Sequence, residues 1–280
     1  MSATTTTPST TPGRTPAARV RTGRRTDLPP IAPIPLGRVV RVELRKMFDT
    51  RSGFWLIASI GITGLVATIA TIAFAPDDQL TYYTFAKAIG FPITVILPMV
   101  ALLSITSEWS QRSGLTTFTY VASRRRVVGA KTLSSVTVAI ASMLFAFAVG
   151  VVGNVVGSRV ADVPTVWDLS LGHALTIVLG NLISLSIGTV IGMVLRSSAG
   201  GLVVYFVLVL LVPNLSSLLA ASQGWYHDLQ PWVDLPYAQS YLFEGMETGA
   251  QWAHVATAVT LWLVLPGIYG LRRVMRSEVK

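Results

Sequence analysis

Six long apolar segments dominate this chain of 280 residues and leave few folds open to it. A helix needs about 20 largely apolar residues to cross a bilayer. We predict spans at residues 54–75, 85–105, 132–156, 173–195, 198–222 and 252–270. Only 12% of the residues are charged, whereas soluble domains carry about 25%. The sequence therefore predicts an all-α integral membrane protein built as a bundle of six transmembrane helices.

Lys and Arg are distributed unevenly around these segments. If the six spans alternate in direction, 20 of the 22 bases lie on one side, while Lys87, Arg159 and eight of the 13 acids lie on the other. An excess of Lys and Arg marks the cytoplasmic side of short loops. We therefore predict that both termini are cytoplasmic. The absence of cysteine fits a multi-pass protein of the bacterial inner (cytoplasmic) membrane.

The region before the first span divides into a tail and a helix. Residues 1–35 are rich in Thr, Ser, Pro and Arg, which predicts a disordered cytoplasmic tail. After it, Val40, Leu44, Met47 and Phe48 fall on one helical face. A basic amphipathic helix ahead of a span is expected in the membrane interface, with its arginines near lipid headgroups. The pattern leaves open a generic anchor or an elbow helix in contact with a cytosolic partner.

The predicted spans hold few groups that could do chemistry. Spans 1, 3, 5 and 6 contain no Asp, Glu, Lys or Arg, so no proton relay is evident. No zinc-binding His pair, serine-nucleophile motif or P-loop occurs, and we predict no enzyme activity, cofactor or metal in this chain. The net charge of +9 is spread over connectors and tails, which argues against nucleic acid as a partner. If transport is powered, the power comes from another chain.

Small residues recur every four positions in two of the spans. Such stripes let helix backbones approach closely, either within one bundle or at a dimer seam. The stripes are Ser142, Ala146, Gly150 and Asn154 in span 3, and Gly180, Ser184, Gly188 and Gly192 in span 4. Three asparagines also lie in apolar surroundings, where they could face a substrate path or bond to neighbouring helices: Asn154, Asn181 and Asn214.

The segment after the fifth span is unusual for an outer connector. Pro213 removes a helical hydrogen-bond donor, so we expect the fifth span to be interrupted there. Residues 223–251 then carry two Trp and three Tyr but no Lys or Arg. Trp and Tyr favour the membrane–water boundary. We predict a short re-entrant or interfacial helical pair, which could line an exit path or serve only as an anchor.

The connector at residues 107–131 is the only sizeable internal loop on the basic side. It combines Glu108, Trp109, Arg112 and Gly114 with a semi-apolar centre and the Arg124–Arg126 run. A loop that only fixes orientation through its excess of Lys and Arg would need the bases but not the semi-apolar centre. A short amphipathic helix that docks into a groove of a partner explains both.

With these elements in order, residues 36–280 resemble the permease subunits of ABC-2 type transporters. The resemblance rests on the stretch from Val42 to Trp55, on six spans with both ends inside, and on the connector. In the connector, Glu108 precedes Gly114 by six residues, an Arg-rich turn follows, and Lys131 opens the third span. Many relatives have a proline just before the Arg run, where this chain has Ala122-Ser123.

The resemblance implies a coupling helix that sits in a cleft of a separate ATPase subunit, with the elbow helix beside it. It implies two permeases, either identical copies or paralogues, paired with two ATPases that bind ATP and Mg. It assigns coupling to Glu108, Arg112, Gly114, Arg124, Arg125, Arg126 and Lys131, and the elbow to Arg41, Glu43, Arg45 and Lys46.

We therefore expect the permease subunit of an ATP-driven exporter, in which residues 36–280 form the translocation path in contact with membrane lipid. A membrane scaffold or sensor component on the same fold, without transport, is the alternative. An intramembrane enzyme is disfavoured because no catalytic constellation occurs. The sequence does not specify the exported substrate.

Overall fold

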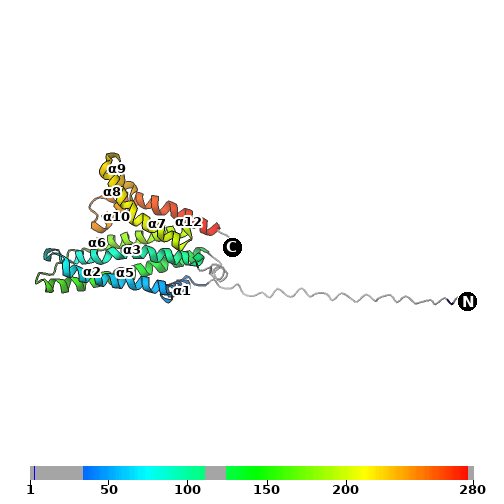
Figure 1. Ribbon diagram of the computed structural model, residues 1–280, viewed down its shortest axis with the longest axis horizontal. Coiled ribbons are helices and arrows are strands. Elements are labelled where there is room, and N and C mark those ends of the chain that lie inside the picture. Colours follow the sequence, from blue (N-terminus) through cyan, green and yellow to red (C-terminus); the bar gives the residue numbers. More distant parts are fainter. Residues whose placement is uncertain (1–2, 4–33, 111–123, 277–280) are drawn as a thin grey trace. The chain divides into compact units, whose positions relative to one another are not determined.

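The computed structural model describes Ala3 and residues 34–110 and 124–276, which form helices without a β-strand (Figure 1). The long helices are α1 (Leu36–Asp49), α2 (Arg51–Phe74), α3 (Tyr82–Ser110), α5 (Arg124–Val160) and α6 (Leu171–Leu195). A fifth apolar run comprises α7 (Ser198–Phe206), η2 (Val207–Leu211) and α8 (Val212–Ser222). The remaining helices are α9 (Gly224–Val233), α10 (Leu235–Glu244), α11 (Gly249–Val259), η3 (Thr260–Val264) and α12 (Leu265–Arg276).

Six of these helices or helical runs are long and apolar enough to cross a membrane, which confirms the predicted number of spans. Four of the six extend beyond the predicted bounds because helices continue past their most apolar parts, whereas the first is shifted by one residue and the fifth coincides with 198–222. The longest, α5, has 37 residues, or about 56 Å at 1.5 Å per residue. A hydrocarbon core of about 30 Å cannot enclose that length. Helix α5, which begins with the Arg124–Arg126 run, is therefore longer than the apolar part of a membrane.

Helix α3 lies at the centre of the bundle and packs against α2, α5 and α6. The core between them includes Ile60, Ile93, Leu97, Met143 and Leu185, which are all buried. Helices can pack this closely because the predicted small-residue stripes lie at their contacts. A Cβ at Gly188 would overlap the carbonyl of Pro98, and one at Gly192 would lie 3.1 Å from Ile105. These stripes serve packing within one chain, as one of the two predicted alternatives proposed.

The three asparagines find hydrogen-bond partners in different ways. Asn181 on α6 accepts a hydrogen bond from Thr94 on α3 at 3.2 Å, so it joins two helices. Asn154 donates to the carbonyl of Val166 in the connection to α6. Asn214 donates to a carbonyl of its own helical run. Of these three bonds, the one made by Asn181 is the interhelical bond that the sequence suggested.

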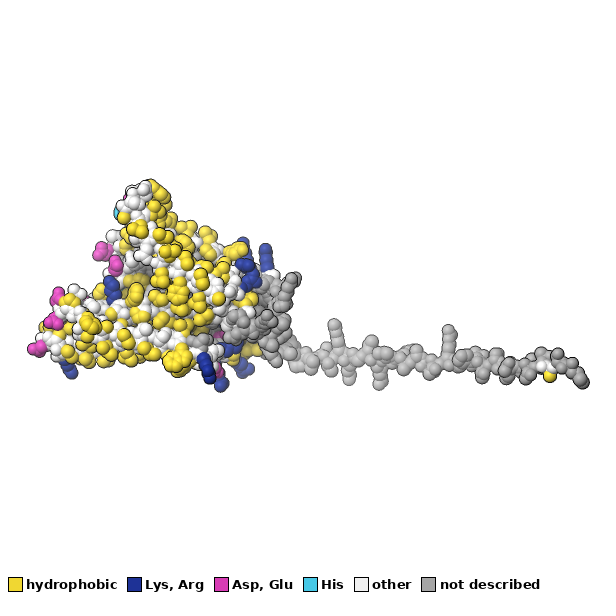
Figure 2. Space-filling model, in the orientation of Figure 1, with side chains coloured by type: hydrophobic (Ala, Val, Ile, Leu, Met, Phe, Trp, Pro, Cys, Tyr) yellow, Lys and Arg dark blue, Asp and Glu magenta, His cyan; other side chains and the backbone are white. Residues whose placement is uncertain are grey.

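Charged side chains separate to the two ends of the bundle. Figure 2 shows most of the Lys and Arg side chains at one end, most of the Asp and Glu side chains at the other beside a few bases, and a largely apolar surface between them. At the basic end, Ile105 of α3, Met193 of α6 and Val274 of α12 share one cluster. At the acidic end, the backbone N–H of Tyr83 donates to Asp168 at 2.8 Å. The spans therefore alternate in direction, as the tally of bases assumed.

The fifth span differs from the expected interruption at Pro213. The helical path continues to Ser222, and a π-helical segment, η2, ends at Leu211, two residues before the proline. In this segment the N–H of Val212 donates five residues back to Val207. The wider turn accommodates a residue that lacks an N–H, because a π-turn shifts the hydrogen-bond register. The proline therefore changes the helix type without ending the span.

The connector between the fifth and sixth spans forms a pair of short helices, α9 and α10. The indole of Trp262, near the middle of the sixth span, donates to the carbonyl of Val233 at their junction, at 2.7 Å. Gln239 of α10 donates to the carbonyl of Gly180 on α6, also at 2.7 Å. The aromatic connector is thus packed along the spans, and its helical character agrees with the prediction.

Candidate functional site

The candidate site lies at the basic end, where α1 crosses the start of α5. Helix α1 buries one face, made of Val39, Glu43 and Met47. Met47 packs with Val100 of α3 and Val138 of α5, which fixes the helix against the bundle. Glu43 is the one charged residue on this otherwise apolar face. It is buried in the contact, with only 4% of the residue exposed.

Glu43 lies between two lysines. Its Oε2 is 2.6 Å from the Nζ of Lys131 on α5, and its Oε1 is 2.8 Å from the Nζ of Lys46. Lys131 is also buried, at 3% exposed, and donates to the hydroxyl of Ser107 on α3 at 3.4 Å. A buried charge is costly unless it is paired and hydrogen-bonded. This ion pair therefore ties α1, α3 and α5 together at one point.

A backbone contact strengthens the same junction. The hydroxyl of Ser134, one turn after Lys131, donates to the carbonyl of Val40 on α1 at 3.2 Å. Nearby, the guanidinium of Arg126 donates to the carbonyl of Ile34 at 3.4 Å. Side chains at the start of α5 thus hold α1 at Val40 and Glu43 and hold the residue Ile34 ahead of it.

The other predicted residues are placed as follows. Arg41, Arg45, Arg125 and Arg126 are exposed, and Arg45 pairs with Asp49 at 3.2 Å. Glu108 lies in the last turn of α3 and Arg124 begins α5, but their side chains are outside the described part of the chain. Arg112 and Gly114 lie outside the described residues, as does most of the predicted coupling helix.

Further bases at this end come from α6 and α12. Arg273 donates to the carbonyl of Val194 at 2.7 Å, which brings it close to Arg196 at the end of α6. Burial lowers the pKa of Arg196 and repulsion by Arg273 lowers it further, while Tyr269 acts in the opposite direction. Like charges held close together raise the positive potential of a surface. The basic end is therefore suited to an acidic partner surface.

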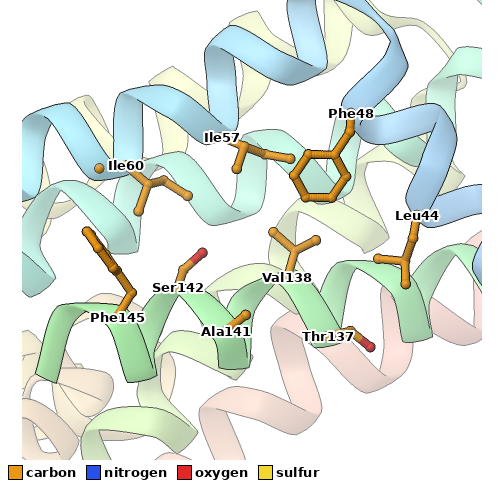
Figure 3. A pocket seen from close by; sticks show the side chains of 10 residues that line it. Leu44, Phe48, Ile57, Ile60, Thr137, Val138, Ala141, Ser142 and Phe145 are labelled. Carbon is orange, nitrogen blue, oxygen red and sulfur yellow. The ribbon is translucent and has the colours of Figure 1, made fainter. Parts of the chain in front are cut away.

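An apolar groove of about 480 Å³ lies between α1, α2 and α5 (Figure 3). Figure 3 shows Phe48 of α1 and Ile57 of α2 reaching toward Val138 of α5, with Phe145 at the far end. Side chains in protein interiors are usually close-packed, so a groove between packed helices marks a loosely packed contact. Here α1 and α2 are loosely packed against α5 on the side where Phe48 is half exposed.

Sequence reasoning missed one buried acid, Asp234, between α9 and α10. It is 6% exposed and caps α10, since its Oδ1 accepts from the N–H of Tyr237 at 3.2 Å. Its other oxygen accepts from Ser216 and from Gln230. The sequence did contain a signal, because Asp followed two residues later by Pro236 is typical of a helix start.

Within the part of the chain that the structure describes, no group of three or more His, Cys, Asp or Glu could hold a metal ion. No protein-family model matches the chain, and no curated protein is significantly similar to it.

Proposed function

We propose that this chain is the permease subunit of an ATP-driven exporter of the ABC-2 type. The observation that carries the proposal is the buried ion pair between Glu43 and Lys131. It fastens an amphipathic helix to the start of a span at the end of the bundle where bases gather. An ATPase that moved the connector before Lys131 would displace α1, α3 and α5 together, because they meet at this pair.

In this proposal the connector at 107–131 is the coupling helix, and the permease dimer works with two ATPase subunits that bind ATP and Mg. The rigidity of α5 supports it, since one continuous helix joins the basic end to the acidic end. Toward the acidic end, the hydroxyl of Tyr82 on α3 donates to the carbonyl of Phe147 on α5. A movement of α5 would therefore also displace α3 at this second contact. The groove beside Phe48 provides the space into which α1 and α2 shift.

The same proposal sets the orientation in the membrane. The basic end and both termini are cytoplasmic, and α1 lies in the interface as the elbow helix. The exposed Arg41 and Arg45 of α1 face the headgroup layer, where bases interact with anionic lipids. The α9–α10 pair is re-entrant, supported by the bond from Trp262 to the α9–α10 junction. The membrane is the bacterial inner membrane.

Charge reversal of the Arg124–Arg126 run to Glu tests the proposal. We expect loss of co-purification with a P-loop ATPase encoded by an adjacent reading frame, while membrane insertion is kept. Arg159→Glu is the matched control, because this base lies at the opposite end of the same helix, α5. It should leave the complex intact.

Reconstitution in liposomes then separates transport from a scaffold role. We expect vanadate-sensitive ATP hydrolysis that requires this chain and falls severalfold in the charge-reversed variant. An intact chain that binds no ATPase would contradict the proposal. Binding without any hydrolysis or transport would favour the scaffold or sensor role.

A further inference from the structure

A second cavity, of about 390 Å³, lies between α6, the fifth span and the sixth span. Ligand pockets typically enclose about 300–1,000 Å³, so its size suits one small molecule. Its walls are apolar and include Ile187, Val190, Val204, Leu208, Trp262 and Pro266. The α9–α10 junction closes one end of the cavity, since Val233, Asp234 and Leu235 also line it.

That end of the cavity is polar, in contrast to its walls. Ser216 and Tyr226 line it beside Asp234, and their hydroxyls are 2.8 Å apart. Ser216 donates to Asp234, and the amide of Gln230 donates to both, at 3.2 Å to Ser216 and 3.3 Å to Asp234. The cavity is therefore amphipathic, with a long apolar part and one built polar end.

The charge of Asp234 calls for a partner. None of the ion pairs found among the described residues includes this carboxylate, although it is 6% exposed. An ionised carboxylate has about four acceptor positions, and Ser216, Gln230 and Tyr237 use three of them. An acid buried against transmembrane helices is a candidate functional residue, and a cation is its expected partner.

We propose that this cavity binds a lipophilic amine, with its ammonium group on Asp234 and its hydrocarbon chain along α6, η2 and Trp262. The ammonium supplies both the missing countercharge and the fourth hydrogen bond. The apolar walls favour an alkyl chain because burial removes it from water. This binding does not depend on the proposed export function, since every residue named belongs to this chain and no ATPase takes part.

Photolabelling of the full chain in detergent tests the proposal, with decylamine and decanol that each carry a diazirine. Labelling by the amine should be saturable, should map to α6, η2 and the sixth span, and should be displaced by unlabelled decylamine. A hydrogen bond to a charged group favours the amine over the equally long alcohol by about tenfold or more. Equal affinity of the two probes for the wild-type chain would overturn the proposal and indicate a cavity that accepts any alkyl chain.

Three variants sharpen the test. Asp234→Asn should lower the affinity for the amine to that for the alcohol, about tenfold, whereas Asp228→Asn should change neither. Asp228 is the matched control, because it lies on α9 with its side chain 88% exposed. Val204 lines the apolar part of the cavity and is 38% exposed. Val204→Phe should fill that part while leaving the carboxylate in place, and so weaken the binding of both probes. Unchanged amine binding in Asp234→Asn or in Val204→Phe would overturn the proposal.

Discussion

At the scale of single residues, the buried charges carry the most information. Glu43 and Lys131 are 88 positions apart, yet their charged groups meet at 2.6 Å with almost no exposure to solvent. Burial removes the hydration of both ions, so partners within the protein must replace it, which Lys131 and Lys46 do for Glu43, and Glu43 and Ser107 do for Lys131. Such a contact fixes which turn of α1 faces which turn of α5. The ion pair therefore fixes the register between α1 and α5 as well as contributing to stability.

A double-mutant cycle measures this coupling. Glu43→Gln, Lys131→Met and their combination should give an interaction energy of about 1–3 kcal/mol in thermal unfolding of the purified protein, because the two groups are in direct buried contact. The exposed pair Arg45–Asp49 on α1 is the control, with side chains 82% and 64% exposed. Its cycle should give about 0.3–0.5 kcal/mol, as for other exposed pairs one helical turn apart. Equal coupling energies for the two pairs would contradict the assigned role of Glu43.

The sequence indicated these residues only in part. The family resemblance points to both Glu43 and Lys131, but nothing in the local pattern indicates that they meet, because pairing across 88 residues depends on the tertiary fold. Asp234 was missed because it lies in a connector that the apolar pattern places outside the spans. Its burial follows from the way α9 and α10 pack along the sixth span, which hydropathy does not encode.

At the scale of elements, the contact between α3 and α6 depends on a glycine. Gly188→Ala should lower the melting temperature of the purified protein, since the added methyl group would overlap the Pro98 carbonyl and force the two helices apart. Overpacking of this kind costs about 1–3 kcal/mol. Gly90→Ala on α3 is the control, because a Cβ there meets no atom within 4 Å. It should leave the melting temperature unchanged or raise it, and a similar loss in both variants would contradict the packing argument.

Six helices could be predicted because each apolar run has about the length needed for a span, which can be read from the sequence without tertiary structure. The effect of Pro213 on the helix could not be predicted. The loss of one N–H can produce a break, a kink or a π-turn, and packing against the neighbouring helices determines which of these forms. The small-residue stripes indicated close approach but not the partner. The contact of Gly188 with Pro98 identifies that partner as α3 of the same chain.

At the scale of the whole molecule, the separation of charge is the feature from which the proposed orientation and the proposed partner are argued. Bases at one end favour retention on the cytoplasmic side, and their close spacing, as at Arg196 and Arg273, favours an acidic partner. The apolar surface between the ends faces lipid in the proposed arrangement (Figure 2). In the proposed assembly the same residues serve insertion and partner binding, so variants at the basic end need an independent check of topology.

The absence of cysteine from the chain makes that check direct. Single cysteines at Gln79 and Glu247, both exposed at the acidic end, should react with a membrane-impermeant maleimide on intact cells, because the proposed topology places them outside. Cysteines at Arg38 and Arg272, both exposed at the basic end, should react only after the membrane is opened. The unmodified chain is the control and should remain unlabelled. Reaction of Arg38→Cys or Arg272→Cys on intact cells would contradict a cytoplasmic basic end, and with it the proposed access of an ATPase to the Glu43–Lys131 junction.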